Sequence, residues 1–115
     1  MDSNPAFIQG IFPFSGEGLD KPVPLDGASY IVPYDKRSQL IYFRAGSGAD
    51  ELVTLVLMRN GKLMRYFPLG AQSAMHVPLA VVEDLTPEST VEVLIAAAAG
   101  VKATAVLDIG FLEID

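Results

Sequence analysis

The sequence predicts an all-β, single-domain antiparallel β-sandwich, jelly-roll-like, with about seven or eight strands and little helix. Three observations support this fold class: short apolar runs rich in β-branched and aromatic residues, frequent glycine and proline turns between them, and a C-terminal segment of alternating character. That segment, 101–112, alternates with period two directly after Gly100. A small closed barrel fits the same strand pattern, so the topology stays open at this point.

The first 27 residues are punctuated by glycine and proline and are expected to hold a single short strand, near residues 7–12, followed by a loop to Asp26. A brief strand at 30–32 is stopped by Pro33. The next strand, 39–45, ends at a glycine-serine-glycine break.

A β-hairpin over residues 52–67, turned at Asn60 and Gly61, is the strongest local signal, because both central positions of a type I′ turn need positive φ. A two-residue loop places Leu55 opposite Tyr66 and makes both faces of the hairpin mostly apolar. Such a hairpin is expected to be covered twice, by its own sandwich partner and by a neighbouring molecule. The residues predicted to form that interface are Leu55, Leu57, Met64 and Tyr66.

Two further segments complete the strand count. The segment 75–82 contains Pro78, which favours an edge strand or a bulge. Segment 91–99 is ambiguous, because its alanine run favours a helix and its β-branched start favours a strand. We prefer the strand, since 101–112 then closes the chain as a strand, glycine turn and strand.

The composition points to a single domain spanning residues 1–115 with surplus apolar surface. Half of the residues (50%) are hydrophobic and only 19% are charged. A domain of this size has a large ratio of surface to volume, so some apolar residues must stay exposed or cover another subunit. We therefore expect a homo-oligomer or a protein partner.

The charge and hydropathy patterns exclude other partners and suggest a compartment. A net charge of −6 opposes nucleic-acid binding, because the phosphate backbone requires a basic surface. The longest uncharged apolar run, 94–101, is far short of the roughly 20 residues that span a bilayer. The first residues lack the pattern of a secretion signal and cysteine is absent, so a soluble, cytoplasmic location is expected.

No catalytic residue, cofactor or metal is predicted. His76 is the only histidine, and the nearby Ser73 lacks the strand-turn-helix elbow that activates a nucleophile. The glycine-rich segments do not match a phosphate-binding loop, and the loop carboxylates match no defined calcium loop. We therefore expect a protein that is not an enzyme, with a small hydrolase or isomerase based on His76 as the third hypothesis.

Two groups of residues are candidates for ligand binding. Tyr34, Lys36 and Arg37 form a polar, aromatic loop. Arg44 and Arg65 lie within apolar strands, where each must reach water at a strand end, pair with a carboxylate such as Asp108 or Glu92, or face a pocket or interface. The main functional hypothesis is a protein-interaction or self-assembling domain acting through an apolar sheet face. The alternative is a small-molecule or carbohydrate binding module using this loop and the strand arginines.

Overall fold

The computed structural model describes residues 3–115, and side chains for all of these except 79–83. Eight strands follow one another along the chain, and no helix is present in the described part. They are β1 (Ser3–Ser15), β2 (Gly18–Ile31), β3 (Arg37–Ser47), β4 (Val53–Arg59), β5 (Lys62–Leu69), β6 (Ala74–Leu85), β7 (Thr90–Ala97) and β8 (Lys102–Ile114). The prediction of an all-β protein is confirmed, and so is the preference for a strand over 91–99.

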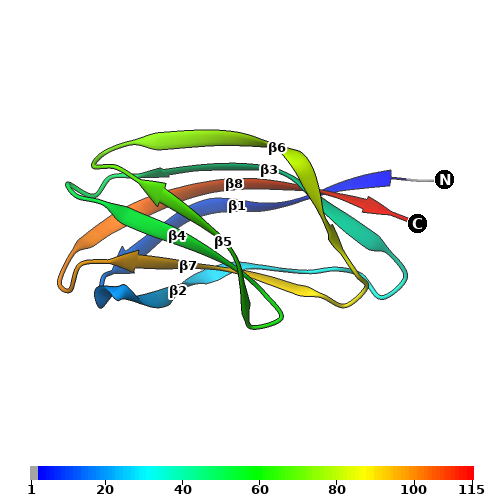
Figure 1. The fold of residues 1–115 in the computed structure, drawn as a ribbon, viewed down its shortest axis with the longest axis horizontal. Helices are drawn as coiled ribbons and strands as arrows, with labels where there is room; N and C mark the ends of the chain where they lie inside the picture. The colour runs from blue at the N-terminus through cyan, green and yellow to red at the C-terminus, as the bar shows by residue number, and fades with distance from the viewer. Residues whose placement is uncertain (1–2) are drawn as a thin grey trace.

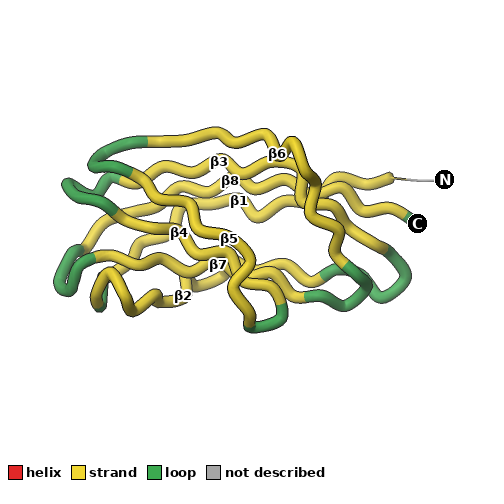
Figure 2. Tube along the Cα trace, viewed as in Figure 1, coloured by secondary structure: helices red, strands yellow, loops and turns green. Residues whose placement is uncertain are grey.

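The strands form two antiparallel sheets, one with the order β1–β8–β3–β6 and the other with the order β2–β7–β4–β5 (Figure 1). Strands that follow each other in the chain fall in different sheets, except β4 and β5, which form a hairpin. Two four-stranded sheets connected in this way are the double Greek key of a jelly roll. The tube in Figure 2 shows the two layers one above the other, with loops at both ends of the sandwich.

The core lies between the two sheets and is held by aromatic pairs that reach across it. Phe43 of β3 stacks on Phe67 of β5 with ring centroids 3.8 Å apart. Tyr30 of β2 stacks on Phe111 of β8 at 4.3 Å. Each pair joins one sheet to the other, and stacked aromatic rings contribute about 0.5–1.5 kcal/mol beyond the area they bury.

The prediction for residues 1–27 is wrong in one respect, because this segment contains two strands rather than one. All of β1 and most of β2 lie in it. Both are edge strands, and this explains how prolines are accommodated there, since an edge strand has amides that need no partner within the sheet. Proline weakens the strand signal of this segment, although the segment forms one edge strand of each sheet.

Every proline within a strand lies on an edge strand. β1, β2, β5 and β6 are the edges of the two sheets, and the strand prolines are Pro5, Pro13, Pro22, Pro24, Pro68 and Pro78. The interior strands β3, β4, β7 and β8 contain no proline. The placement of Pro78 on an edge strand confirms the prediction made from its sequence.

The hairpin is turned at Asn60 and Gly61 as predicted, with φ values of 51° and 78°. The predicted pairs of Arg59 with Lys62 and Met58 with Leu63 are also present. A register shift then follows, so that Leu57 faces Arg65 instead of Met64, and Leu55 faces Phe67 instead of Tyr66. Met64 is the extra residue of a β-bulge, which moves all later β5 residues to the opposite face.

The two ends of the described chain lie side by side. β1 and β8 are paired along their whole lengths, with Ser3 opposite Ile114. Figure 1 shows both ends leaving the sandwich at the same end of its long axis.

Candidate functional site

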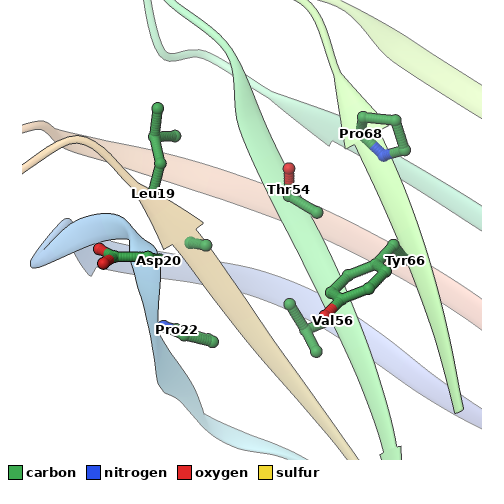
Figure 3. A pocket seen from close by; sticks show the side chains of 8 residues that line it. Leu19, Asp20, Pro22, Thr54, Val56, Tyr66 and Pro68 are labelled. Atoms are coloured by element: carbon green, nitrogen blue, oxygen red, sulfur yellow. The ribbon is translucent and has the colours of Figure 1, made fainter. Parts of the chain in front are cut away.

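A trough of about 380 Å³ lies on the outer face of the β2–β7–β4–β5 sheet, the face turned away from the core (Figure 3). Its floor is made of Thr54 and Val56 on β4 and Ala96 on β7. Val56 and Ala96 are only 3% and 2% exposed, although neither belongs to the core cluster between the sheets. Small side chains on the two interior strands thus leave a depression that the edge strands enclose.

One wall of the trough is formed by a large bulge in β2. Gly18 pairs with Ala97 and Val23 pairs with Ile95, so the four residues 19–22 stand opposite the single residue Ala96. Gly18 has a φ of 143°, a conformation that glycine adopts without strain. The excess chain of this bulge carries Leu19, Asp20 and Pro22 to the edge of the trough, as Figure 3 shows.

The other wall is formed by Tyr66 and Pro68 on β5. The bulge at Met64 is the reason that Tyr66 is here, because it pairs Tyr66 with Val56 on the outer face. Without the bulge the ring would point into the core, as the predicted register implies. The side chain of Tyr66 is 62% exposed, so most of the ring is open to a ligand.

The lining combines one aromatic ring with few polar groups. Asp20 is the single charged residue among those that line the trough, and Thr54 and Tyr66 contribute hydroxyl groups. The remaining lining residues are apolar. An apolar concavity of a few hundred Å³ with a small number of polar groups is the usual form of a small-molecule binding site.

The placement of the predicted interface residues corrects that prediction. Leu55 and Leu57 are fully buried in the core, at 0% exposure, and therefore cannot contact another molecule. Met64 is partly buried and packs against the same core. Tyr66 alone among the four presents a largely exposed side chain, and it faces the trough. The hairpin has one core face and one outer face, and the outer face carries the exposed Leu63 and Tyr66.

The predicted ligand-binding residues lie in three separate places. Tyr34, 78% exposed, and Arg37 lie at the connection from β2 to β3, where Lys36 forms an ion pair with Asp115. Arg44 lies in the middle of β3, in the β1–β8–β3–β6 sheet. Arg65 lies on β5, an edge strand of the β2–β7–β4–β5 sheet. The structure therefore does not gather them into one site.

Of the alternatives considered for Arg44, the structure shows an ion pair with Asp108. One guanidinium nitrogen of Arg44 lies 3.4 Å from Asp108 Oδ2. Hydrogen bonds from Gln9 and Tyr42 hold the pKa of the Asp108 carboxyl below its usual value, and the charge of Arg44 adds to this effect. Asp108 is thus an ionised, well-bonded group.

Sequence reasoning missed most of the trough. The sequence singles out Tyr66 only as part of an apolar interface, and Asp20 is one of the loop carboxylates that match no calcium loop. The signal that marks the wall is the pair Pro22 and Pro24 within a strand, because proline in a strand is confined to edges and bulges. Thr54, Val56 and Ala96 carry no signal of their own, because their role follows from which strands neighbour each other.

Other kinds of site find less support in the described residues. Among the side chains that the structure describes, no group of three or more histidine or carboxylate residues is arranged to hold a metal ion. His76 lies on the exposed face of β6 with its ring edge-on to Tyr42, at 5.9 Å between centroids. Residues 3–115 contain no helix long and apolar enough to cross a membrane.

No protein-family model and no curated protein sequence matches the chain. Solved structures do match it in fold. One is the CBM36-1 domain of a multidomain xylanase from the hindgut metagenome of Trinervitermes trinervoides, at 16% identity and a TM-score of 0.57, covering 95% of this chain and 96% of that domain. Another is a family 35 carbohydrate binding module from Clostridium thermocellum, at 12% identity and a TM-score of 0.53, covering 94% and 97%. At these identities the similarity establishes a shared fold: the chain has the β-sandwich architecture found in these carbohydrate-binding modules.

Proposed function

We propose that this protein is a non-catalytic carbohydrate-binding module and that its ligand occupies the trough over the β2–β7–β4–β5 sheet. The observation that carries the proposal is Tyr66, whose largely exposed ring borders a concavity that also holds the carboxylate of Asp20 and the hydroxyl of Thr54. The two structural neighbours, similar over nearly the whole chain, support the same class of function at the level of the fold.

The chemistry of the trough suits a sugar. A pyranose ring has a face of C–H bonds, which packs against the negative face of an aromatic ring, and a rim of hydroxyl groups. Tyr66 supplies the aromatic face, and Asp20 and Thr54 supply hydrogen-bonding groups on β2 and β4. The apolar side chains beside these polar groups lower the local polarity and so strengthen the hydrogen bonds.

The test compares two exposed tyrosines. The purified protein is run by affinity electrophoresis in gels containing soluble xylan, mannan, mixed-linkage glucan or polygalacturonate, and affinity is then measured by calorimetry. We expect retardation by at least one polysaccharide and about tenfold weaker binding for Tyr66→Ala. Tyr34→Ala is the matched control, because Tyr34 is also largely exposed but lies outside the trough.

The outcomes separate the possibilities. Binding that survives Tyr34→Ala and is lost in Tyr66→Ala supports the trough. The reverse pattern would move the site to the loop with Lys36 and Arg37 and overturn the trough assignment. Absence of binding to every glycan tested, by a folded protein, would reject the proposed function.

A further inference from the structure

On the β1–β8–β3–β6 sheet, the side chains of the outer face form three rows that run across the strands. The registers of β1, β8, β3 and β6 place residues of like character side by side in each row. The first row is Phe7, Gly110, Tyr42 and Pro78; the second is Gln9, Asp108, Arg44 and His76; the third is Ile11, Val106, Gly46 and Ala74. We call the second of these the polar row. It lies between two apolar rows.

The polar row is built around Asp108. Gln9 donates a hydrogen bond of 3.0 Å from its amide nitrogen to Oδ1 of Asp108, and the Tyr42 hydroxyl donates one of 2.8 Å to the same oxygen. Arg44 approaches the other oxygen, Oδ2. The guanidinium of Arg44 also lies 5.7 Å from the centre of the Tyr42 ring. These contacts fix the positions of Gln9, Asp108 and Arg44 in the polar row and of Tyr42 in the first row.

The first row supplies an aromatic surface beside the polar row. Gly110 has no side chain, and a Cβ there would overlap atoms of the Tyr42 ring. The ring of Tyr42 therefore occupies the space that a side chain at position 110 would fill, in the same row as Phe7 on β1. Phe7 is 47% exposed. An aromatic platform thus borders the row of hydrogen-bonding groups.

A hollow of about 310 Å³ opens on the other side of the polar row. Gly46 and Ala74 have little or no side chain, so the sheet surface is low where they meet, and Val106, Arg44 and Asp108 rise around it. The surface of the hollow is almost wholly apolar, including the parts of Arg44 and Asp108 that face it. The hollow is large enough for a small ring next to the guanidinium and the carboxylate.

The charges and hydrogen-bonding groups of the polar row indicate the ligand class. Arg44 and Asp108 neutralise each other, so the row offers no net charge to attract an ion. It presents donors on Arg44 and Gln9 next to an acceptor on Asp108. Hydroxyl groups both donate and accept, whereas a carboxylate or phosphate only accepts and an ammonium only donates. Adjacent hydroxyls on a neutral ring match this arrangement.

We propose that the polar row is a second glycan site, specific for neutral sugars, on the face opposite the trough. This inference rests on the proposed function and extends it to a module with two binding faces. The apolar face of a sugar ring lies in the hollow, and its vicinal hydroxyls reach out to the carboxylate of Asp108 and the guanidinium of Arg44. The wholly separate lining of the two sites makes them independent of each other.

The experiment removes each site separately and counts the ligands bound. Asp108→Asn keeps the shape of the side chain and removes its charge, and Ala74→Ile fills the hollow from an exposed position of an edge strand. Ala71→Ile is the control, since Ala71 is exposed in the turn before β6 and does not line the hollow. Binding of xylohexaose, cellohexaose, mannohexaose and an oligogalacturonate is measured by calorimetry, and amide NMR spectra locate each ligand.

We expect two ligands per chain for a neutral oligosaccharide, with one site lost in Tyr66→Ala and the other in Asp108→Asn and in Ala74→Ile. The amides of Arg44, Gly46 and Asp108 should shift in Tyr66→Ala when the sugar is added. One ligand per chain, abolished by Tyr66→Ala without shifts at these amides, would overturn the second site and leave the proposed function standing. If the oligogalacturonate shifts these amides and binds more tightly than the neutral oligosaccharides, the proposed specificity for neutral sugars is overturned. No binding of any probe to the wild type would reject both.

Discussion

The hydroxyl of Tyr30 lies at the margin of the core, where it donates a hydrogen bond of 2.7 Å to Glu113 and contacts Ser38 at 3.1 Å. Burial, and then the hydrogen bond to the charged Glu113, raise the pKa of Tyr30 to about 12 from 10.0, although the contact with Ser38 opposes this shift. The folded state thus favours the neutral phenol.

The consequence is a loss of stability in strong base. Because the pKa is raised on folding, the contribution of Tyr30 is complete below pH 10 and is lost as the pH rises through about 12. We expect the free energy of unfolding of wild type to fall more steeply over this interval than that of Tyr30→Phe. Tyrosinate absorbance of the folded protein should show one late titration that the variant lacks; a variant that retains it would contradict the assignment.

Gly110 is the residue on which the Tyr42 ring rests. Gly110→Ala would force the ring off the backbone and break its hydrogen bond to Asp108, so we expect destabilisation by about 1–3 kcal/mol, as for other overpacked sites. Gly46→Ala is the control, because a Cβ at Gly46 meets only ordinary contacts, the nearest at 3.4 Å from Ala74. Urea unfolding measures both. Equal, small effects of the two substitutions would show that the ring does not need Gly110.

At the residue scale, the sequence could predict contacts that follow from chemistry alone. An unpaired charge within an apolar strand is costly, so Asp108 is one of the two carboxylates expected as partners of Arg44 or Arg65. This reasoning could not find the rest of the polar row, because Gln9 and Asp108 are neighbours only through the pairing of β1 with β8. Nothing in the separate segments specifies that pairing.

In the hairpin of β4 and β5, the local sequence predicts the turn but not the register of the strand that follows it. The turn depends on two positive φ values, and an Asn-Gly pair such as Asn60 and Gly61 predicts them from the sequence. The bulge at Met64 depends on how β5 packs as an edge strand, and no turn residue marks it. One extra residue was enough to invert the predicted faces of β5 and to move Tyr66 from the expected interface to the trough.

Asn60 also ties the hairpin to the start of β7. Its Oδ1 accepts a hydrogen bond of 2.9 Å from the backbone N–H of Thr90, and its own N–H donates to the Thr90 carbonyl at 2.9 Å. Asn60→Ala loses the side-chain acceptor and strains the left-handed backbone, so we expect a cost of about 1–2 kcal/mol. Asn60→Gly loses only the acceptor and should cost less. Thermal melts compare them, and a larger loss for the glycine variant would contradict this account.

The element pattern was predicted best where each strand alternates or ends at a clear turn, as in 101–112 and the hairpin. It was predicted worst in residues 1–27, where Pro5, Pro13, Pro22 and Pro24 suppress the strand signal. These prolines are compatible with strands only because β1 and β2 are edges, and edge position is a property of the assembled sheet.

The whole molecule resists pairing of its sheets with those of other molecules. All four edge strands contain proline, which cannot donate to a hydrogen-bond ladder added from outside. β1 is the most exposed to this risk, since its 13 residues pair with β8 in an unbroken register and its free edge is interrupted only by Pro5 and Pro13. Assembly of the kind expected from the apolar composition would therefore have to use sheet faces instead of edges.

Replacing Pro5 and Pro13 with threonine should restore a continuous edge on β1. We expect the apparent mass of this variant to rise with concentration above that of wild type, measured by light scattering. Pro87→Thr is the control, because Pro87 lies in the turn between β6 and β7 and protects no edge. If the double variant and the control scatter alike, these prolines do not guard the edge.

The adjacent ends of the chain have a practical consequence. Ser3 and Ile114 are partners on neighbouring strands, which lie about 4.8 Å apart in a sheet. A surface loop of a host protein can therefore be opened between two consecutive residues and this domain inserted with short spacers, without stretching the host backbone. Both outer faces run along the length of the sandwich, away from the junction, so such a chimera would carry the trough and the polar row as a compact internal affinity tag.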